Sequence, residues 1–127
     1  MINNARALAP VLGAVLLAAG CAGQPGGGAP GAITVEASDD ACKLSATSAA
    51  AGTIRFDITN KGSQVTEFYL YDEGGRIVSE VENIGPGLSR QLVAEVPQGG
   101  KYTTACKPGM KGDGIRGEFT VTEPVTP

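Results

Sequence analysis

The sequence contains no histidine and no tryptophan, and it has only three Phe and three Tyr among 127 residues. The absence of histidine excludes His-based acid–base catalysis, Ser-His and Cys-His nucleophile pairs, and the commonest metal ligand in proteins. Because aromatic side chains are scarce, Val, Ile, Leu and Ala have to supply most of any hydrophobic core. No base lies next to a candidate nucleophile, and no phosphate-binding loop is present. We therefore expect a protein that is not an enzyme.

The sequence also lacks a cluster of positive charge. Ten Lys and Arg residues stand against thirteen Asp and Glu, which gives a formal net charge of −3. Counterion release, the main favourable contribution to nucleic-acid binding, has no basic surface through which to act. We predict a monomer that does not bind nucleic acid.

No apolar run is long enough to span a bilayer, which takes roughly 20 residues. Residues 7–20 form a shorter apolar run of the kind found in secretory signals. This run ends in Leu17-Ala18-Ala19-Gly20-Cys21, which resembles the lipobox of bacterial lipoproteins. The resemblance implies that residues 1–20 are a lipoprotein signal peptide and that Cys21 carries the lipid. The protein would then be anchored to the extracytoplasmic side of the cell membrane. The alternative is an ordinary cleavable signal with a chance cysteine.

The composition changes again after Cys21. Residues 22–32 read A-G-Q-P-G-G-G-A-P-G-A, a composition that cannot bury apolar surface and gives a flexible tether. We assign residues 21–32 to the lipidated cysteine and its tether, residues 33–123 to one folded domain, and residues 124–127 to a C-terminal tail.

The folded part has the pattern of β-strands. In residues 53–60, Ile54, Phe56 and Ile58 share one face, and polar side chains share the other. Residues 65–71 are rich in β-forming residues and apolar on both faces, which predicts a central strand. Short strands separated by Gly, Pro, Asn and Asp, with no credible helix, predict an all-β sandwich of about seven to eight strands.

Three cysteines are present. If Cys21 is lipidated, Cys42 and Cys106 remain as a pair. An extracytoplasmic location permits a disulfide between them, which would stabilise the fold by about 4 kcal/mol in the chain-entropy description. Cys106 also stands at the mouth of a predicted β-hairpin over residues 102–121, a suitable place for a metal ligand. The cysteines alone leave both interpretations open, with the disulfide level or slightly ahead.

The hairpin segment, with Tyr102, Cys106 and Pro108, resembles the C-terminal ligand hairpin of cupredoxins. The resemblance implies a Greek-key cupredoxin-like sandwich. In that family two histidines and a methionine ligate copper beside the cysteine. Here those three positions hold, in chain order, Glu67, Gly109 and Ile115. Because a blue-copper site needs two imidazoles and a thiolate, an electron carrier of that type is excluded.

A narrower resemblance is to the cupredoxin domain of EfeO, an extracytoplasmic component of ferrous-iron uptake. Its pattern includes Cys42, Glu67, Cys106 and the turn E-N-I-G-P-G at residues 82–87. The resemblance implies that these three side chains bind a copper or iron ion and that iron- or copper-transport components are partners. Typical members continue into a helical imelysin-like domain, which we do not expect here because the sequence ends at Pro127 without the histidine of its H-x-x-E motif. The alternative function is a structural or interaction lipoprotein with a Cys42–Cys106 disulfide and no metal.

Overall fold

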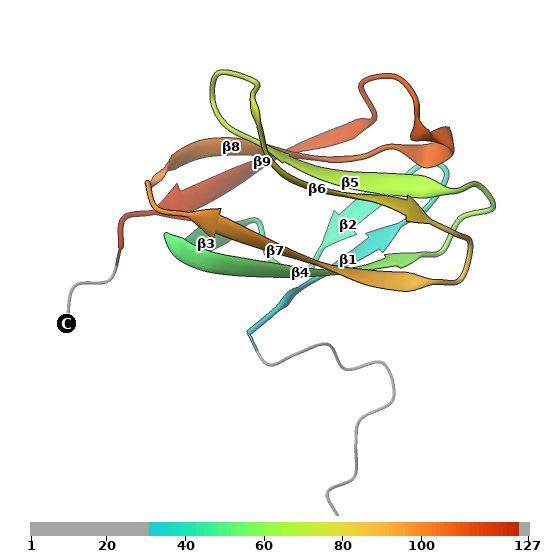
Figure 1. The fold of residues 1–127 in the computed structure, drawn as a ribbon, viewed down its shortest axis with the longest axis horizontal. Helices are drawn as coiled ribbons and strands as arrows, with labels where there is room; N and C mark the ends of the chain where they lie inside the picture. The colour runs from blue at the N-terminus through green and yellow to red at the C-terminus, as the bar shows by residue number, and fades with distance from the viewer. Residues whose placement is uncertain (1–30, 125–127) are drawn as a thin grey trace, which may run out of the picture.

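A computed structural model describes residues 31–124 of the chain. The predicted signal peptide, Cys21, most of the tether and residues 125–127 lie outside this part. Within it the chain forms nine strands and one short 3-10 turn (Figure 1). None of the helical structure in this part is long and apolar enough to cross a membrane. The elements are β1 (Ile33–Ala37), β2 (Cys42–Leu44), β3 (Ser48–Ala50), β4 (Gly52–Asn60), β5 (Thr66–Tyr71), β6 (Ile77–Ile84), β7 (Ser89–Val96), β8 (Gly100–Cys106), η1 (Pro108–Met110) and β9 (Ile115–Thr122).

The strands make two sheets that pack face to face (Figure 1). One sheet has the order β2-β1-β4-β7 and the other β3-β9-β8-β5-β6. The pairs β1–β4 and β3–β9 are parallel, and the other pairs are antiparallel. The predicted all-β sandwich is confirmed. The sequence predicted about seven to eight strands where the structure has nine, because the three-residue β3 is rich in Ala and Ser and carries no clear strand pattern.

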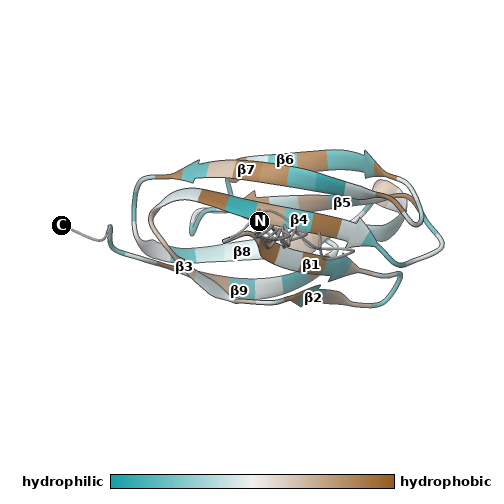
Figure 2. Ribbon diagram, turned by 90° about the horizontal axis from the view of Figure 1, so that it is seen from below, coloured by the Kyte–Doolittle hydropathy of each residue, from teal (hydrophilic) through white to brown (hydrophobic). Residues whose placement is uncertain are grey.

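The core lies between the sheets. Ile54, Phe56 and Ile58 of β4 are buried, as their alternation with polar residues predicts. The Phe56 ring lies 5.1 Å from the ring of Phe68 and 5.5 Å from that of Phe119, measured between centroids. Apolar and polar residues alternate along the strands in Figure 2, so that each strand offers one face to the core.

The strand β5 is buried along its whole length. It lies between β6 and β8 in the larger sheet, so the prediction of a central strand is confirmed. Phe68 and Leu70 face the core between the sheets, whereas Tyr69 and Tyr71 form a second small cluster with Ala105 on the outer face of the sheet. Both faces of β5 are therefore buried, one in the core between the sheets and the other in the small cluster on the outer face.

Candidate functional site

The two candidate cysteines lie at one end of the sandwich, which we call the cysteine end. It is formed by the turns that follow β1, β4, β6 and β8 (Figure 1). Backbone hydrogen bonds join these turns: Gly109 donates to the Val65 carbonyl at 2.8 Å, and Gly87 donates to the Asn60 carbonyl at 2.8 Å. Segments distant in the sequence are thereby fixed around the cysteines.

Asn60 is the central hydrogen-bonding residue of this end, although only 1% of it is exposed. Its Nδ2 donates to the carbonyls of Gln64 and Ile84, at 2.7 and 2.8 Å, and its Oδ1 accepts from the Gly62 amide at 2.9 Å. The Asn60 amide also donates to the Leu88 carbonyl at 2.9 Å. The turn in the E-N-I-G-P-G sequence is thus held against the end of β4, which gives this motif a structural role.

Asp39 closes the cysteine end from the turn between β1 and β2. Its carboxylate accepts hydrogen bonds from the Ser63 hydroxyl and from the amides of Ser63 and Gln64. The hydrogen bond from the Ser63 side chain is the largest influence, and it holds the pKa of Asp39 below its ordinary value. Gly62 permits the close approach, because a Cβ at that position would collide with Asp39.

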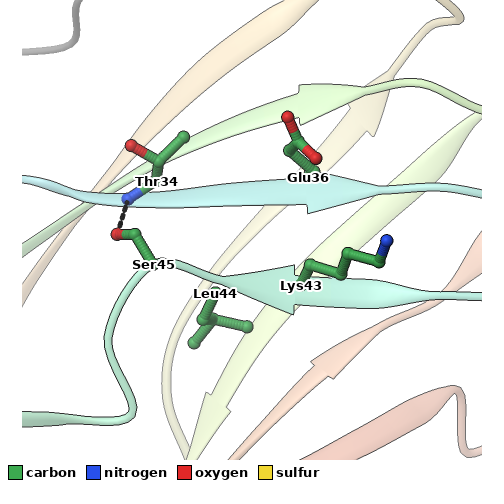
Figure 3. Close-up of a pocket in the computed structure, with 5 residues that line it drawn as sticks. All are labelled: Thr34, Glu36, Lys43, Leu44 and Ser45. Atoms are coloured by element: carbon green, nitrogen blue, oxygen red, sulfur yellow. Dashed lines mark hydrogen bonds between the residues drawn. The ribbon is translucent and has the colours of Figure 1, made fainter.

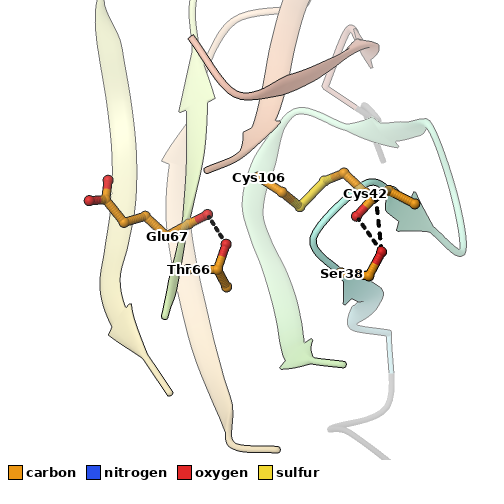
Figure 4. Close-up of a disulfide and its surroundings, with 6 residues drawn as sticks. Ser38, Cys42, Thr66, Glu67 and Cys106 are labelled. Carbon is orange, nitrogen blue, oxygen red and sulfur yellow. Dashed lines mark hydrogen bonds between the residues drawn. A yellow bond between two sulfur atoms is a disulfide. The ribbon is translucent and has the colours of Figure 1, made fainter. Parts of the chain in front are cut away.

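Cys42 and Cys106 are joined by a disulfide, with their Cα atoms 5.6 Å apart (Figure 4). Cys42 is the first residue of β2, an edge strand of the smaller sheet, and Cys106 is the last residue of β8, an interior strand of the larger one. Cys106 is fully buried in the core, whereas Cys42 is half-buried against it. Of the two interpretations that the sequence left open for this pair, the structure shows the disulfide.

Glu67, the third predicted ligand, lies on the other side of β5. Successive side chains of a strand point to opposite faces, and Phe68 faces the core. Glu67 therefore faces outward, and Figure 4 shows its side chain pointing away from the disulfide. Thr66, which is 1% exposed, is the residue on the disulfide side of this strand. The structure thus brings together the two cysteines but not the glutamate, and the three-residue ligand set remains a prediction.

Glu67 instead belongs to a group that we call the outer-face cluster: Glu67, Tyr69, Tyr71, Lys107 and Arg116. The first three are each 7% exposed. The two tyrosine rings are stacked, with centroids 5.5 Å apart and an interplanar angle of 6°. Lys107 Nζ lies 4.2 Å from the Tyr69 centroid, and the Arg116 guanidinium lies 4.8 Å from the Tyr71 centroid. These cation–π contacts cover the rings on a face that would otherwise expose them to water.

The placement of Glu67 on this face affects the ionisation of Tyr69. The Glu67 carboxylate beside the Tyr69 hydroxyl raises the pKa of Tyr69, and burial and the Glu80 carboxylate add to the shift. The Tyr69 hydroxyl also donates to Glu82 Oε1 at 3.4 Å. This cluster was not predicted from the sequence, although Glu67, Tyr69 and Tyr71 stand at every second residue and so share one face of a strand.

The residues at the cysteine end do not fit a copper centre in this form. Histidine is absent, and both sulfurs are used in the disulfide, so no thiolate is available. Gly109 has a φ of 74°, and a Cβ there would lie 2.8 Å from Gln64 Oε1. The backbone of the loop at this position therefore favours glycine over histidine. Residues 31–124 contain no group of three or more His, Cys, Asp or Glu side chains that could hold a metal ion.

A hollow of about 220 Å³ lies on the outer side of β1 and β2 (Figure 3). It is lined by Thr34, Glu36, Lys43, Leu44 and Ser45. The Ser45 hydroxyl accepts a hydrogen bond from the Thr34 amide at 2.9 Å. This contact joins the end of β2 to β1.

Comparison with solved structures defines the class of fold. The chain is similar to a dithionite-reduced auracyanin from the photosynthetic bacterium Roseiflexus castenholzii, with 18% identity, a TM-score of 0.59, and coverage of 75% of this chain and 99% of that one. It is similar to auracyanin B, with 19% identity, a TM-score of 0.56 and coverage of 72% and 88%. It is also similar to auracyanin A of Chloroflexus aurantiacus, a "blue" copper protein, with 13% identity, a TM-score of 0.51 and coverage of 72% and 100%. At these identities the similarity shows a shared cupredoxin-like β-sandwich.

The sequence itself matches the family described as "Cupredoxin-like domain" over residues 11–121. The chain therefore belongs to the cupredoxin-like domain family, as the hairpin around Cys106 predicted. A search of curated proteins finds no match. The narrower EfeO-type assignment stays a prediction.

Proposed function

We propose that this protein is an extracytoplasmic, lipid-anchored cupredoxin-like domain in which a disulfide stands where the family has its copper centre. The observation that carries the proposal is the Cys42–Cys106 disulfide, which contains the cysteine that resembles the cupredoxin copper ligand. An oxidising compartment suits such a bond, and the lipobox-like sequence ending at Cys21 supports a location in one. The domain would then act as a disulfide-stabilised structural or interaction module held at the membrane by its lipid.

The experiment is a thiol and metal assay on protein isolated from its own membrane without reductant. We expect no reactive thiol from Cys42 or Cys106 before reduction, two after reduction in denaturant, and no bound metal in stoichiometric amount. Two free thiols together with one equivalent of copper or iron would refute the proposal. Mass spectrometry of the N-terminal peptide tests the lipid on Cys21, and an unmodified Cys21 would refute the anchor.

A second candidate function is copper or iron handling by the reduced pair, associated with transport components as in the EfeO resemblance. The Cα separation of 5.6 Å favours it, because reduction would leave two thiols side by side. Since Glu67 faces away from them, the pair alone would form the ligand set. Two soft thiolates prefer Cu(I) to iron, and their need to lose protons would weaken binding in acid.

An anaerobic Cu(I) competition titration separates the two functions. If the reduced pair binds copper, the reduced domain takes up one equivalent, and the oxidised domain and Cys42→Ser take up none. Glu67→Gln is the matched variant at the third predicted ligand, and we expect it to bind as the wild type does. Failure of the reduced domain to bind Cu(I), Cu(II), Fe(II) and Zn(II) would leave only the disulfide module.

A further inference from the structure

The two sulfurs of the disulfide lie in very different surroundings. Cys106 is 0% exposed and belongs to the main core cluster, on a strand with β9 on one side and β5 on the other. Cys42 is half-buried and lies on an edge strand. A disulfide sulfur reacts only if a thiolate can reach it. Cys42 is therefore the partly exposed member of the pair, and Cys106 is the member that is closed off from solvent.

The strand that carries Cys42 is also the less firmly held of the two. The strand β2 has three residues, of which the outer two are half-buried, and it pairs only with β1 within the described residues. The turn before it is closed by three hydrogen bonds between Ser38 and Ala41, at 2.8, 3.0 and 3.4 Å. By contrast, Cys106 pairs with Phe68 on one side and Ile115 on the other. Short edge elements open at lower free energy than interior strands, so local opening exposes Cys42 while Cys106 stays buried.

From this asymmetry we infer that Cys42 is a thiol-exchange site in the folded protein. The thiolate of a small thiol or of a dithiol protein attacks Cys42 Sγ, the S–S bond breaks, and Cys106 leaves as a thiolate that takes a proton from solvent. The product is a mixed disulfide on Cys42. A second thiolate then displaces Cys42 and carries away the oxidised thiol, so that two thiols remain in the domain and the thiol reagent has been oxidised.

This inference rests on the proposed function, and it adds that reduction of the disulfide begins at Cys42. Reduction from the Cys42 side frees the end of β2 and leaves the strand pairs β4–β7, β5–β6 and β8–β9 in place, because none of them includes β2. The domain therefore changes locally and stays folded. The same step would produce the dithiol that the second candidate function requires.

The test treats the oxidised full-length protein with limiting glutathione, traps the products with N-ethylmaleimide, and maps the adducts by peptide mass spectrometry. We expect glutathione on Cys42 and maleimide on Cys106, in excess over the reverse pattern by at least about tenfold. Opening should be faster than global unfolding and insensitive to low urea. Glutathione on Cys106, or opening only at the rate of global unfolding, would overturn the inference.

Two variants, each with one cysteine of the pair replaced by serine, provide an independent comparison. Cys106→Ser leaves the Cys42 thiol, and we expect it to react with an aromatic disulfide reagent on the order of tenfold faster or more than the thiol of Cys42→Ser. Equal reaction rates of the two variants would overturn the inference. If either variant is unfolded, the adduct mapping on the wild-type protein decides. Native protein with two free thiols before any treatment would instead refute the proposed function, so the two failures are distinguishable.

Discussion

At the scale of single residues, Asn60 does the most to shape the cysteine end. Its side chain makes three hydrogen bonds with the backbone while almost fully buried. If the Asn60 amide were removed, the buried Ile84 carbonyl would lose its bond without gaining water, and leaving a buried polar group unpaired is costly. All three side-chain hydrogen bonds of Asn60 go to backbone groups of the surrounding turns. These bonds account for a buried polar side chain at this position without a bound ligand.

Replacement of Asn60 by Ala should lower the free energy of unfolding by about 2 kcal/mol, because it leaves the buried Ile84 carbonyl unpaired and removes two partly buried hydrogen bonds. Urea denaturation measures the loss. The neighbouring Thr59→Ala is the matched control, since its hydroxyl pairs with Ser89 at an exposed position, and we expect about 0.5 kcal/mol or less there. Equal losses in the two variants would contradict the role given to Asn60.

Asp39 makes stability depend on pH. Its folded-state pKa lies below its ordinary value of 3.8, because the Ser63 side chain donates to the carboxylate. A carboxylate with a lowered folded pKa contributes stability above its unfolded pKa, and this contribution is lost as the pH falls through the folded pKa. The difference in unfolding free energy between wild type and Asp39→Asn should therefore be constant near neutral pH and shrink below about pH 4. Urea titrations from neutral pH to below about pH 4, with Asp40→Asn as the control variant, measure this. A difference between wild type and Asp39→Asn that stays the same at all pH values would contradict the role of Asp39.

Glu67 and Tyr69 offer a direct check on which way Glu67 points. Because the Glu67 carboxylate is the main cause of the raised pKa of Tyr69, Glu67→Gln should lower that pKa toward the ordinary value of 10.0. Alkaline titration followed by tyrosinate absorbance should show one of the three tyrosines ionising at lower pH than in the wild type. Glu36→Gln, on the outer face of the other sheet, should leave the curve unchanged. An unaltered curve for Glu67→Gln would mean that Glu67 is not on the outer face.

At the scale of elements, the disulfide connects two strands that have no other direct pairing. Cys42 and Cys106 are 64 residues apart in the sequence, so the bond restricts a large loop of the unfolded chain. In the chain-entropy description a loop of that size is worth about 4 kcal/mol. The double variant Cys42→Ala/Cys106→Ala should lose about that much unfolding free energy while keeping the β-sheet circular dichroism of the wild type. Reductant should destabilise the wild type and leave the double variant unaffected, and a wild type indifferent to reductant would contradict the bond's structural role.

The sequence predicted some elements better than others, for physical reasons. The strand Gly52–Asn60 alternates clearly and has one buried face, and the hairpin of β8 and β9 is bounded by Gly and Pro, so both were predictable. The strand β5 is apolar on both faces, and a pattern without alternation does not reveal which residues face inward. The sequence therefore could not assign Glu67 to a face, although it did predict that the strand is central.

At the scale of the whole molecule, the family follows from the sequence, but the state of the cysteines does not. The residues around Cys106 predicted the cupredoxin-like family, which the family match over residues 11–121 and the auracyanin-like fold now show. The distance between Cys42 and Cys106 in space is not encoded in their spacing along the chain, so a disulfide and a metal site both remained open. In the structure the start of the edge strand β2 lies against the end of β8. This packing of the two sheets brings the Cys42 and Cys106 sulfurs together.

The central claim is that a disulfide, and not a metal centre, occupies the cysteine end. A crystal structure of the domain purified without reductant, with anomalous data collected at the copper and iron absorption edges, tests it most directly. We predict continuous density between the Cys42 and Cys106 sulfurs, no anomalous peak beside them, and a Glu67 carboxylate on the outer face near Tyr69. A metal peak ligated by separate Cys42 and Cys106 sulfurs, with Glu67 turned inward to join them, would contradict the account.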